Sequence, residues 1–447
     1  MTERTPSKHI TNPRTMGSET EYTTAITGSL DRRVDPDKVL HYEDPDNLWL
    51  KNGARLYIDH GRVIEYATPE CSSGFEVMLQ ERVGEHVVRE LGDIVIREID
   101  PEFADLMESE PRTPVYKRTG YADVRKTDEP STSLMSPNLS TGHHETYQTT
   151  LTRSQLESGN GYHLLNAYLS TRIVWSGTGL VSTLGYELSQ KAPGINFSGS
   201  SPTRHGDKMP YRFKGDGLLE IRLGEGNMSD WAIATKFDMT SLVLRMMEHG
   251  ISLRNVDLRN KQENVAFRTA STNPLAMIPT ESGRLDAIDI QCMIAEEAIL
   301  FGEKHGAPRH EIQAAENVLK ACYDVQAFLT HQDSIDTVSD RIDWAAKLHK
   351  LYSRGIGLGQ ISCANLIAVA YDLSWEDLSP HGSARRWYAK HQPDRVTEPK
   401  IKRTFNQPPE GRASSRVALL QEHSGEIRSV EWDYITLTNG NSYPITD

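Results

Sequence analysis

Short runs in which apolar and polar residues alternate are concentrated in residues 16–225 and predict β-strands. The clearest example is Trp49–Asp59, where two alternating runs flank Asn52-Gly53. Asn-Gly between such runs is typical of a tight β-hairpin. Strand-like alternation also begins at Met16, as in Glu19–Tyr22, and a further strand is predicted over 218–223, whereas the glycine-rich stretch 189–217 predicts a loop.

Apolar residues at helical spacing dominate the later part of the chain. They predict helices over residues 77–98, 231–249, 285–304, 310–331, 338–352 and 414–422, followed by a strand over 427–437. Strands followed by helices favour an α+β fold over alternating βαβ units. A proline-containing basic stretch over 379–403 predicts a boundary. We therefore expect an N-terminal arm (1–15), a large domain (16–378) and a small C-terminal domain (379–447) that docks on it.

Composition narrows the class of protein further. The 447 residues carry a net charge of −13, no apolar run reaches the roughly 18 residues of a membrane span, and the N-terminus lacks the apolar core of a signal peptide. Acidity argues against a nucleic-acid partner, because neutralising phosphate requires positive charge. The four scattered cysteines suit a reducing compartment. The expectation is a cytoplasmic protein with neither a membrane nor a nucleic-acid partner.

Two glutamates on the first predicted strand are candidates for metal binding. Glu19 and Glu21 are two residues apart and therefore point to the same face of a strand. Paired carboxylates repel each other unless a cation neutralises them, and oxygen-rich sites suit magnesium. The alternative is a solvated strand edge.

The hairpin and the strand after it add further polar candidates. Alternation places Arg55, Tyr57 and Asp59 on one face, where Asp59 is a candidate general base. The alternative is a surface ladder of salt bridges. Glu65 and Glu70 are additional oxygen donors in the same region, and Thr68 is a candidate hydrogen-bond donor to a ligand.

Other candidates lie further along the chain. The functional interpretation of His144 is that it orients or binds a substrate. The alternative is that His143 and His144 form a structural histidine pair. Glu220 and Arg222 share one strand face. No GxxxxGK[ST] phosphate loop is present, so bound ATP would depend on metal and on cations. The candidates for contacting it are Lys191, Arg204 and Arg55 for the phosphates and Trp432 for the adenine.

Several segments together resemble the family that contains the ligase and the deamidase of the prokaryotic ubiquitin-like protein Pup. The similar segments run in order from residue 16 almost to the end. They include Met16–Tyr22, Leu50–Asp59, Glu65–Cys71, Gly142–Tyr147, Arg172–Gly179, Leu188–Lys191, Gly224–Asp230, Ala287–Gln291, Ile342–Leu348, Pro408–Arg416 and Val430–Trp432. The segments NGARLYID and EYATPEC are the most specific.

The resemblance implies a fold similar to glutamine synthetase and the glutamate–cysteine ligases, with a curved antiparallel sheet backed by helices and a small C-terminal domain. It implies magnesium ligands at Glu19, Tyr57 and Glu65, to which we add Glu21 and Glu70. It implies ATP contacts at Arg55, Thr68 and Trp432, and a catalytic base at Asp59. Arg204 is a further candidate ATP contact, and His144, Lys191, Glu220 and Arg222 are candidate substrate contacts.

The implied activity is joining the C-terminal glutamate of a Pup-like acidic tag to exposed lysines of target proteins through a glutamyl phosphate. Thirty residues separate Glu21 from Asn52, a short spacing that favours the ligase over the deamidase, whose long insertion falls here. Hydrolysis of the same bond is the alternative, and a small-molecule glutamate–amine ligase is the second alternative. Departures from the family pattern at Val63-Ile64, Arg118, Thr146 and Glu220 fall where the tag or second substrate would sit.

Overall fold

The computed structural model describes residues 12–22, 30, 33–59, 63–99, 117, 142–158, 160–193, 210–214, 217–259, 262–379, 382–392 and 395–446. The described residues form two compact units. One unit comprises residues 12–15 and Thr146–Asp372, and the other comprises Met16–Glu145 and Leu373–Asp447. Each unit combines two separate stretches of the chain, so the units do not correspond one to one with the predicted domains. The predicted boundaries at 15 and 378 stay predictions.

The unit that contains Met16–Glu145 is built on a sheet with the strand order β2-β3-β4-β5-β1-β6. The pairs from β2 through β5 to β1 are all antiparallel. The strands are β1 (Met16–Tyr22), β2 (Val39–Asp44), β3 (Asn47–Leu50), β4 (Arg55–Asp59), β5 (Val63–Ala67) and β6 (His143–Gln148). The predicted hairpin is confirmed, since Gly53 turns with a φ of 80° between β3 and β4. A positive φ of this kind favours glycine.

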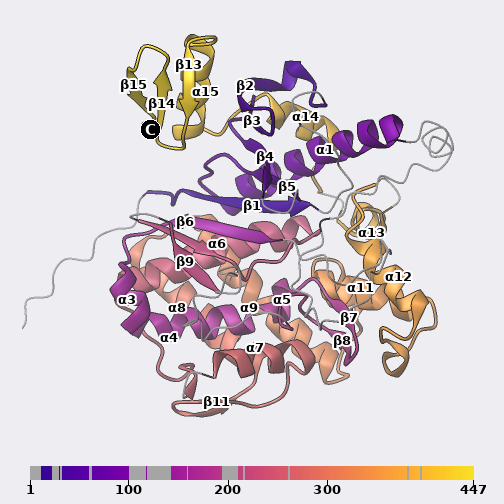
Figure 1. Cartoon of the computed structure of the whole chain (residues 1–447). Coiled ribbons are helices and arrows are strands. Elements are labelled where there is room, and N and C mark those ends of the chain that lie inside the picture. The colour runs from indigo at the N-terminus through magenta and orange to yellow at the C-terminus, as the bar shows by residue number, and fades with distance from the viewer. Residues whose placement is uncertain are drawn as a thin grey trace, which may run out of the picture. The chain divides into compact units, whose positions relative to one another are not determined.

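One face of this sheet packs on the long helix α1 (Gly74–Ile99), which follows β5 in the chain (Figure 1). Every second side chain of a strand points to the inward face. The side chains on this face are fully or almost fully buried at Leu48, Leu56, Ile64 and Tyr66. Gly84 lets the helix approach the sheet, because a Cβ there would lie 2.5 Å from the Tyr66 ring. The buried Asn52 joins the hairpin to the helix by donating to Tyr66 Oη at 2.8 Å and Gln80 Oε1 at 2.7 Å.

A buried ion-pair network fixes the inner side of α1. Lys117 is fully buried, and its Nζ lies 2.6 Å from Glu81 Oε2 and 3.0 Å from Glu85 Oε1. Arg82 also pairs with Glu85. Burial alone would raise the pKa of Glu85, but the charges of Arg82 and Lys117 outweigh it and lower the pKa to about 2 from the usual 4.5. The ionised carboxylate therefore stabilises the fold.

We expect Glu85→Gln to reduce stability at neutral pH by about 3 kcal/mol, the free energy that corresponds to this pKa shift. A lowered pKa gives stability that is present above pH 4.5 and is lost as the pH falls toward 2. Urea unfolding between pH 2 and 7 should thus show a flatter pH dependence in the variant. Glu90→Gln on the same helix is the control, because its ion pair is more exposed and should contribute less than about 1 kcal/mol.

The C-terminal segment belongs to the same compact unit. Helices α13 (Ser383–His391), α14 (Glu398–Phe405) and α15 (Arg412–Glu422) precede a three-stranded antiparallel sheet of β13 (Ile427–Val430), β14 (Tyr434–Leu437) and β15 (Ser442–Pro444). The single strand predicted over 427–437 is wrong, because residues 431–433 turn between β13 and β14. Trp49 of β3 is part of the core formed with Leu420, Val430, Ile435, Leu437 and Ile445, so this segment docks on the larger sheet.

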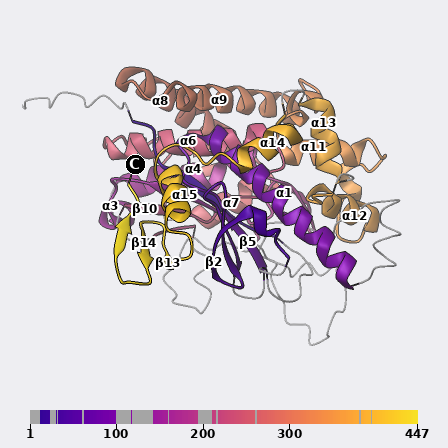
Figure 2. The same cartoon turned by 90° about the horizontal axis from the view of Figure 1, so that it is seen from above.

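The other unit is mainly helical. Its helices are α3 (Arg153–Ser158), α4 (Asn160–Thr171), α5 (Ile173–Ser176), α6 (Asp230–Glu248), α7 (Glu263–Thr272), α8 (Ala287–His305), α9 (Arg309–Leu329), α10 (Asp336–Ser339) and α11 (Asp343–Tyr352). α12 (Leu366–Trp375) crosses the division between the units. Figure 2 shows α8 and α9 lying side by side. The helix predicted over 338–352 is two shorter helices, α10 and α11.

Three short antiparallel pairs complete this unit. They are β7 (Leu180–Ser182) with β8 (Gly185–Glu187), β9 (Tyr211–Phe213) with β10 (Leu218–Ile221), and β11 (Ile278–Thr280) with β12 (Gly283–Leu285). The loop predicted over 189–217 is therefore wrong at β9, while residues 194–209 lie outside the described part. No described helix is both long and apolar enough to cross a membrane.

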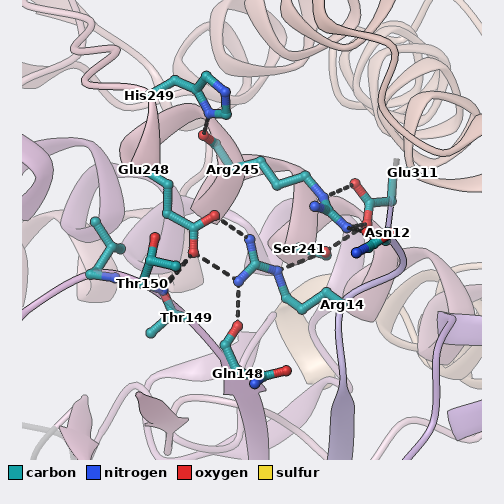
Figure 3. A network of polar contacts seen from close by, with 11 residues as sticks. Asn12, Arg14, Gln148, Thr149, Thr150, Ser241, Arg245, Glu248, His249 and Glu311 are labelled. Carbon is teal, nitrogen blue, oxygen red and sulfur yellow. Dashed lines mark hydrogen bonds and ion pairs between the residues drawn. The ribbon is translucent and has the colours of Figure 1, made fainter. Parts of the chain in front are cut away.

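Polar contacts hold residues 12–15 against helix α6 (Figure 3). Arg14 forms a two-point ion pair with Glu248, at 3.0 and 2.7 Å, and donates to Ser241 Oγ at 3.1 Å. Arg245 binds Glu311 and donates to the carbonyl of Asn12 at 3.0 Å. The end of the predicted arm is thus fixed just before β1 begins, and residues 1–11 lie outside the described part.

Overall, the described elements confirm the expected α+β class with a large antiparallel sheet and helices.

Candidate functional site

The face of the sheet opposite α1 bears a continuous group of polar side chains from three strands. Glu21 of β1 and Tyr57 of β4 both lie directly opposite Glu65 of β5. Glu19 and Arg55 both lie opposite Ala67. Since residues directly opposite one another project to the same face, these side chains and Asp59 share that face.

Three carboxylates on this face form a cluster. Glu21, Asp59 and Glu65 each present an oxygen within 4.8 Å of the other two. Burial raises the pKa of the Glu65 carboxyl well above its usual range, and the charges of Glu19 and Glu21 raise it further. Such a group needs protons or a cation to relieve the repulsion. An all-oxygen set of this kind fits magnesium.

Tyr57 lies beside the cluster and stays neutral. Burial raises the pKa of its hydroxyl, and the negative charges of Glu65 and Glu19 raise it further. A neutral phenol is a hydrogen-bond donor, and Tyr57 shares a side-chain hydrogen bond with Glu65. Tyr57 therefore orients the Glu65 carboxylate and presents a neutral oxygen to any ion bound there.

Gly142 allows the start of β6 to approach the cluster. Its amide donates to Glu21 Oε2 at 2.6 Å, and a Cβ at this position would lie 2.9 Å from both Glu21 Oε1 and His144 Nε2. His144 Nδ1 lies 3.5 Å from Glu19 Oε2, so this histidine belongs to the polar face. His143 lies on the other face, with Nδ1 3.0 Å from Thr20 Oγ1.

Aromatic and cationic side chains continue the site away from the carboxylates. The guanidinium carbon of Arg55 lies 4.9 Å from the centre of the Tyr57 ring and 5.8 Å from that of Trp49, and its Nε donates to Asn47 Oδ1 at 2.7 Å. The rings of Trp49 and Trp432 meet edge to face, with centroids 5.0 Å apart. The series from Glu65 to Trp432 thus has clustered carboxylates at one end, the Arg55 cation in the middle and an indole at the other end.

Thr68 is held at the edge of this face by β1. Its Oγ1 accepts from the amide of Ser18 at 2.9 Å, and its own amide donates to the carbonyl of Ser18 at 2.9 Å. A hydroxyl that accepts in this way keeps its own hydrogen for donation to a ligand.

The structure places Glu70 apart from the carboxylate cluster. Its carboxylate forms a two-point ion pair with Arg416 of α15, with Nη1 to Oε1 at 2.8 Å, and Arg412 Nε lies 3.6 Å from Oε1. Binding a metal through Glu70 would require breaking these pairs. Both of its oxygens are bound by Arg416.

The candidate substrate residues Lys191, Glu220 and Arg222 lie together in the helical unit. Glu220 is fully buried and binds Arg222 Nε at 2.9 Å and Lys214 Nζ at 2.7 Å, as well as Arg212. The ammonium of Lys191 is buried and donates to the carbonyl of Arg222 at 2.6 Å. Glu220 therefore partly neutralises the positive charges of Arg212, Lys214 and Arg222. Arg204 lies outside the described residues.

Three residues at this site were missed by sequence reasoning: Asn47, Trp49 and Arg416. The hairpin register could have indicated two of them, because Asn47 pairs with Tyr57 and Trp49 with Arg55. Arg416 ends one segment of the family resemblance, but its contact with Glu70 gave no local signal, because the two residues lie 346 positions apart.

These features define an α+β protein whose antiparallel sheet bears an oxygen-rich polar face. A family model described as Pup-ligase protein matches residues 31–436. The chain belongs to this Pup ligase family, as its sequence resemblance indicated.

Individual relatives agree with this assignment. The chain is 27% identical over 452 residues to the Pup–protein ligase of Acidimicrobium ferrooxidans, with 94% of this chain and 90% of the relative covered. It is 27% identical over 461 residues to the Pup–protein ligase of Geodermatophilus obscurus, with 95% and 94% covered.

Solved structures show the same fold. The ligase PafA in complex with Pup superposes with a TM-score of 0.73 at 21% identity, covering 97% of this chain and 89% of PafA. A second structure, PafA in complex with ADP, gives a TM-score of 0.70 at 22% identity, covering 95% and 92%.

Proposed function

We propose that this chain is an ATP- and magnesium-dependent ligase. It joins the C-terminal glutamate of a Pup-like acidic protein tag to lysines of target proteins. The observation behind the proposal is the series of side chains on one sheet face from the carboxylate cluster through Arg55 to Trp432. Family membership and the relatives named Pup–protein ligase support it. The proposal includes the implied likeness to glutamine synthetase and the glutamate–cysteine ligases.

In this proposal, Glu19, Glu21, Tyr57 and Glu65 hold magnesium, which offsets phosphate charge when bound. Arg55 and Thr68 contact phosphate oxygens, and Trp432 contacts the adenine. Nucleotide binding is consistent with the ADP that the related PafA structure contains. Glu70 is left out of the metal set because Arg416 binds its carboxylate.

The reaction has two steps. The side-chain carboxylate of the tag's glutamate attacks the γ-phosphorus of ATP, which forms an acyl phosphate and releases ADP. The lysine nitrogen then attacks the acyl carbon, phosphate leaves, and an isopeptide bond forms. Asp59 accepts the proton that the lysine must lose, which is the task of a general base. His144 and the group of Lys191, Glu220 and Arg222 orient the substrates.

Two features bear on the direction of the reaction. The short spacing between Glu21 and Asn52 favours the ligase. The relatives at 27% identity are named ligases as well. Hydrolysis of the same bond by a deamidase uses the same site, so the direction has to be measured.

The test separates the activities by their products. The chain is incubated with Mg·ATP, a Pup-like tag ending in glutamate and a lysine-bearing protein, and intact masses and ADP are measured. A ligase gives a conjugate of target plus tag minus water, with at least one ADP released for each bond. Cleavage of purified conjugate, or deamidation of a tag ending in glutamine, without conjugate formation would contradict the ligase. ADP release with free glutamate and an amine alone would indicate a small-molecule ligase.

A further inference from the structure

Arg416 connects three segments that lie far apart in the sequence. It lies in α15, and its side chain is fully buried. Its guanidinium binds both oxygens of Glu70, which follows β5, and donates to the carbonyl of Gly53 in the β3–β4 turn at 3.3 Å. It also donates to the carbonyl of Trp432 at 3.3 Å. One side chain therefore ties the hairpin and the β5–α1 connection to the C-terminal segment.

The same guanidinium contacts the two indoles of the site. Its central carbon lies 5.0 Å from the centre of the Trp49 ring and 4.7 Å from that of Trp432. Both distances are within the range in which a cation is attracted to an aromatic face. Arg416 Nε is buried and has no hydrogen-bond acceptor among the described residues. The two rings therefore help to stabilise the buried positive charge through cation–π contacts.

Arg416 and Glu70 act as one unit. A buried guanidinium is costly unless an opposite charge and hydrogen bonds compensate it, and Glu70 supplies both. Arginine has a planar fork that can bind a carboxylate at two points and also stack on rings, whereas the ammonium of lysine cannot do both. Losing either member should loosen the contact between Trp432 and Trp49.

The position of this unit relates it to the nucleotide. Trp49 contacts both Trp432 and Arg55. Fixing the indole pair therefore fixes the proposed adenine contact relative to the proposed phosphate contact. A site that is ordered before the ligand arrives avoids paying that ordering cost on binding.

We propose that Arg416, held by Glu70, is a positioning residue for nucleotide binding that sets Trp432 against Trp49. This inference rests on the proposed function, in which Trp432 contacts the adenine. It assigns Glu70 a role in positioning in place of metal binding. It also gives a role to the Pro408–Arg416 segment, which the proposed chemistry does not otherwise use.

The experiment compares Arg416→Met, Arg416→Lys and Glu70→Gln with the wild-type chain. Arg428→Met is the matched control, because Arg428 is exposed on β13 of the same C-terminal segment. The dissociation constant of ADP is measured by calorimetry in the presence of magnesium. Near-ultraviolet circular dichroism reports the Trp49–Trp432 pair without nucleotide, and steady-state kinetics give kcat and the KM for ATP.

We expect Arg416→Met to weaken ADP binding and raise the KM for ATP by about tenfold, the effect of losing a desolvated cation–π contact of roughly 1.4 kcal/mol. The tryptophan dichroism should change, while kcat stays within about twofold of wild type, since Arg416 would not act on the reacting atoms. Arg416→Lys should recover only part of the affinity, and Arg428→Met should match wild type. If Arg416→Met does not fold, Glu70→Gln provides the same comparison.

A folded Arg416→Met variant with wild-type ADP affinity and dichroism would overturn the inference while leaving the proposed function intact. A fall in kcat with an unchanged KM would also overturn it. A wild-type chain that binds no nucleotide would overturn both the inference and the proposed function. A changed dichroism together with weaker ADP binding supports the inference.

Discussion

Replacing Asp59 by asparagine should lower the rate of isopeptide formation by about 10²–10⁴-fold, the usual contribution of a general base. Asparagine has nearly the same shape as aspartate but cannot take up the proton that the attacking lysine must lose. Asp59 lies at the end of β4 on the polar face, and its carboxylate oxygen is within 4.8 Å of those of Glu21 and Glu65. The effect should therefore fall on the step in which the amine attacks.

Nucleotide and metal binding should survive this change. The proposed magnesium ligands Glu19, Glu21 and Glu65 stay in place, so calorimetry should still detect Mg·ADP binding, weakened only by the loss of one charge from the three clustered carboxylates. A pulse of ATP with tag but without target protein should still release ADP, because forming the acyl phosphate requires no lysine. Asp37→Asn is the control, since Asp37 is exposed and is not one of the proposed site residues. Conjugation by Asp59→Asn at the wild-type rate would disprove the assignment of the base.

The polar face of the sheet could be predicted from the sequence because strand alternation is a local property. Glu19 and Glu21 on one strand, and Arg55, Tyr57 and Asp59 on another, are placed on their faces by spacing alone. The Asn52-Gly53 turn fixed which strand pairs with β3. Only the registry between β1 and β5, which brings Glu21 opposite Glu65, required the tertiary structure.

The polar contacts of Glu70 and Lys191 could not be predicted, because their partners are distant in sequence. Spacing placed Glu70 near the other acids, but its carboxylate binds Arg416, which is 346 positions away. Lys191 was a candidate ligand contact in the glycine-rich stretch, and its ammonium is buried against the carbonyl of Arg222. Composition reports the charge of a side chain and not the group that neutralises it.

The contacts between the C-terminal segment and the β3–β4 hairpin could not be predicted either. The C-terminal segment was expected to be a small domain docked on the larger one, with a boundary in the proline-containing basic stretch 379–403. In the structure, Trp49 of β3 enters the core of that segment, and Arg416 returns to the β3–β4 turn. Contacts between the two ends of a chain leave no periodic pattern in either end.

Adding magnesium should reverse the order of stability of the wild-type chain and the Glu65→Gln variant. Without divalent cations the variant should be the more stable, because the buried Glu65 carboxylate faces the charges of Glu19 and Glu21. A carboxyl whose pKa is raised by folding destabilises the fold as the pH rises above the pKa of its unfolded state. The advantage of Glu65→Gln should therefore be absent at acid pH and grow toward neutral pH.

With magnesium the order should invert. A ligand at a hundred times its dissociation constant stabilises the native state by about 2.7 kcal/mol, and the wild-type chain should gain this amount while Glu65→Gln gains little. Urea unfolding with and without magnesium measures both effects without any assay of activity. Glu187→Gln is the matched control, because burial also raises the pKa of Glu187, which is outside the carboxylate cluster. That variant should keep the full response to magnesium. An equal response in Glu65→Gln would show that the cation binds elsewhere, since a neutral amide cannot replace a buried carboxylate as a charged ligand.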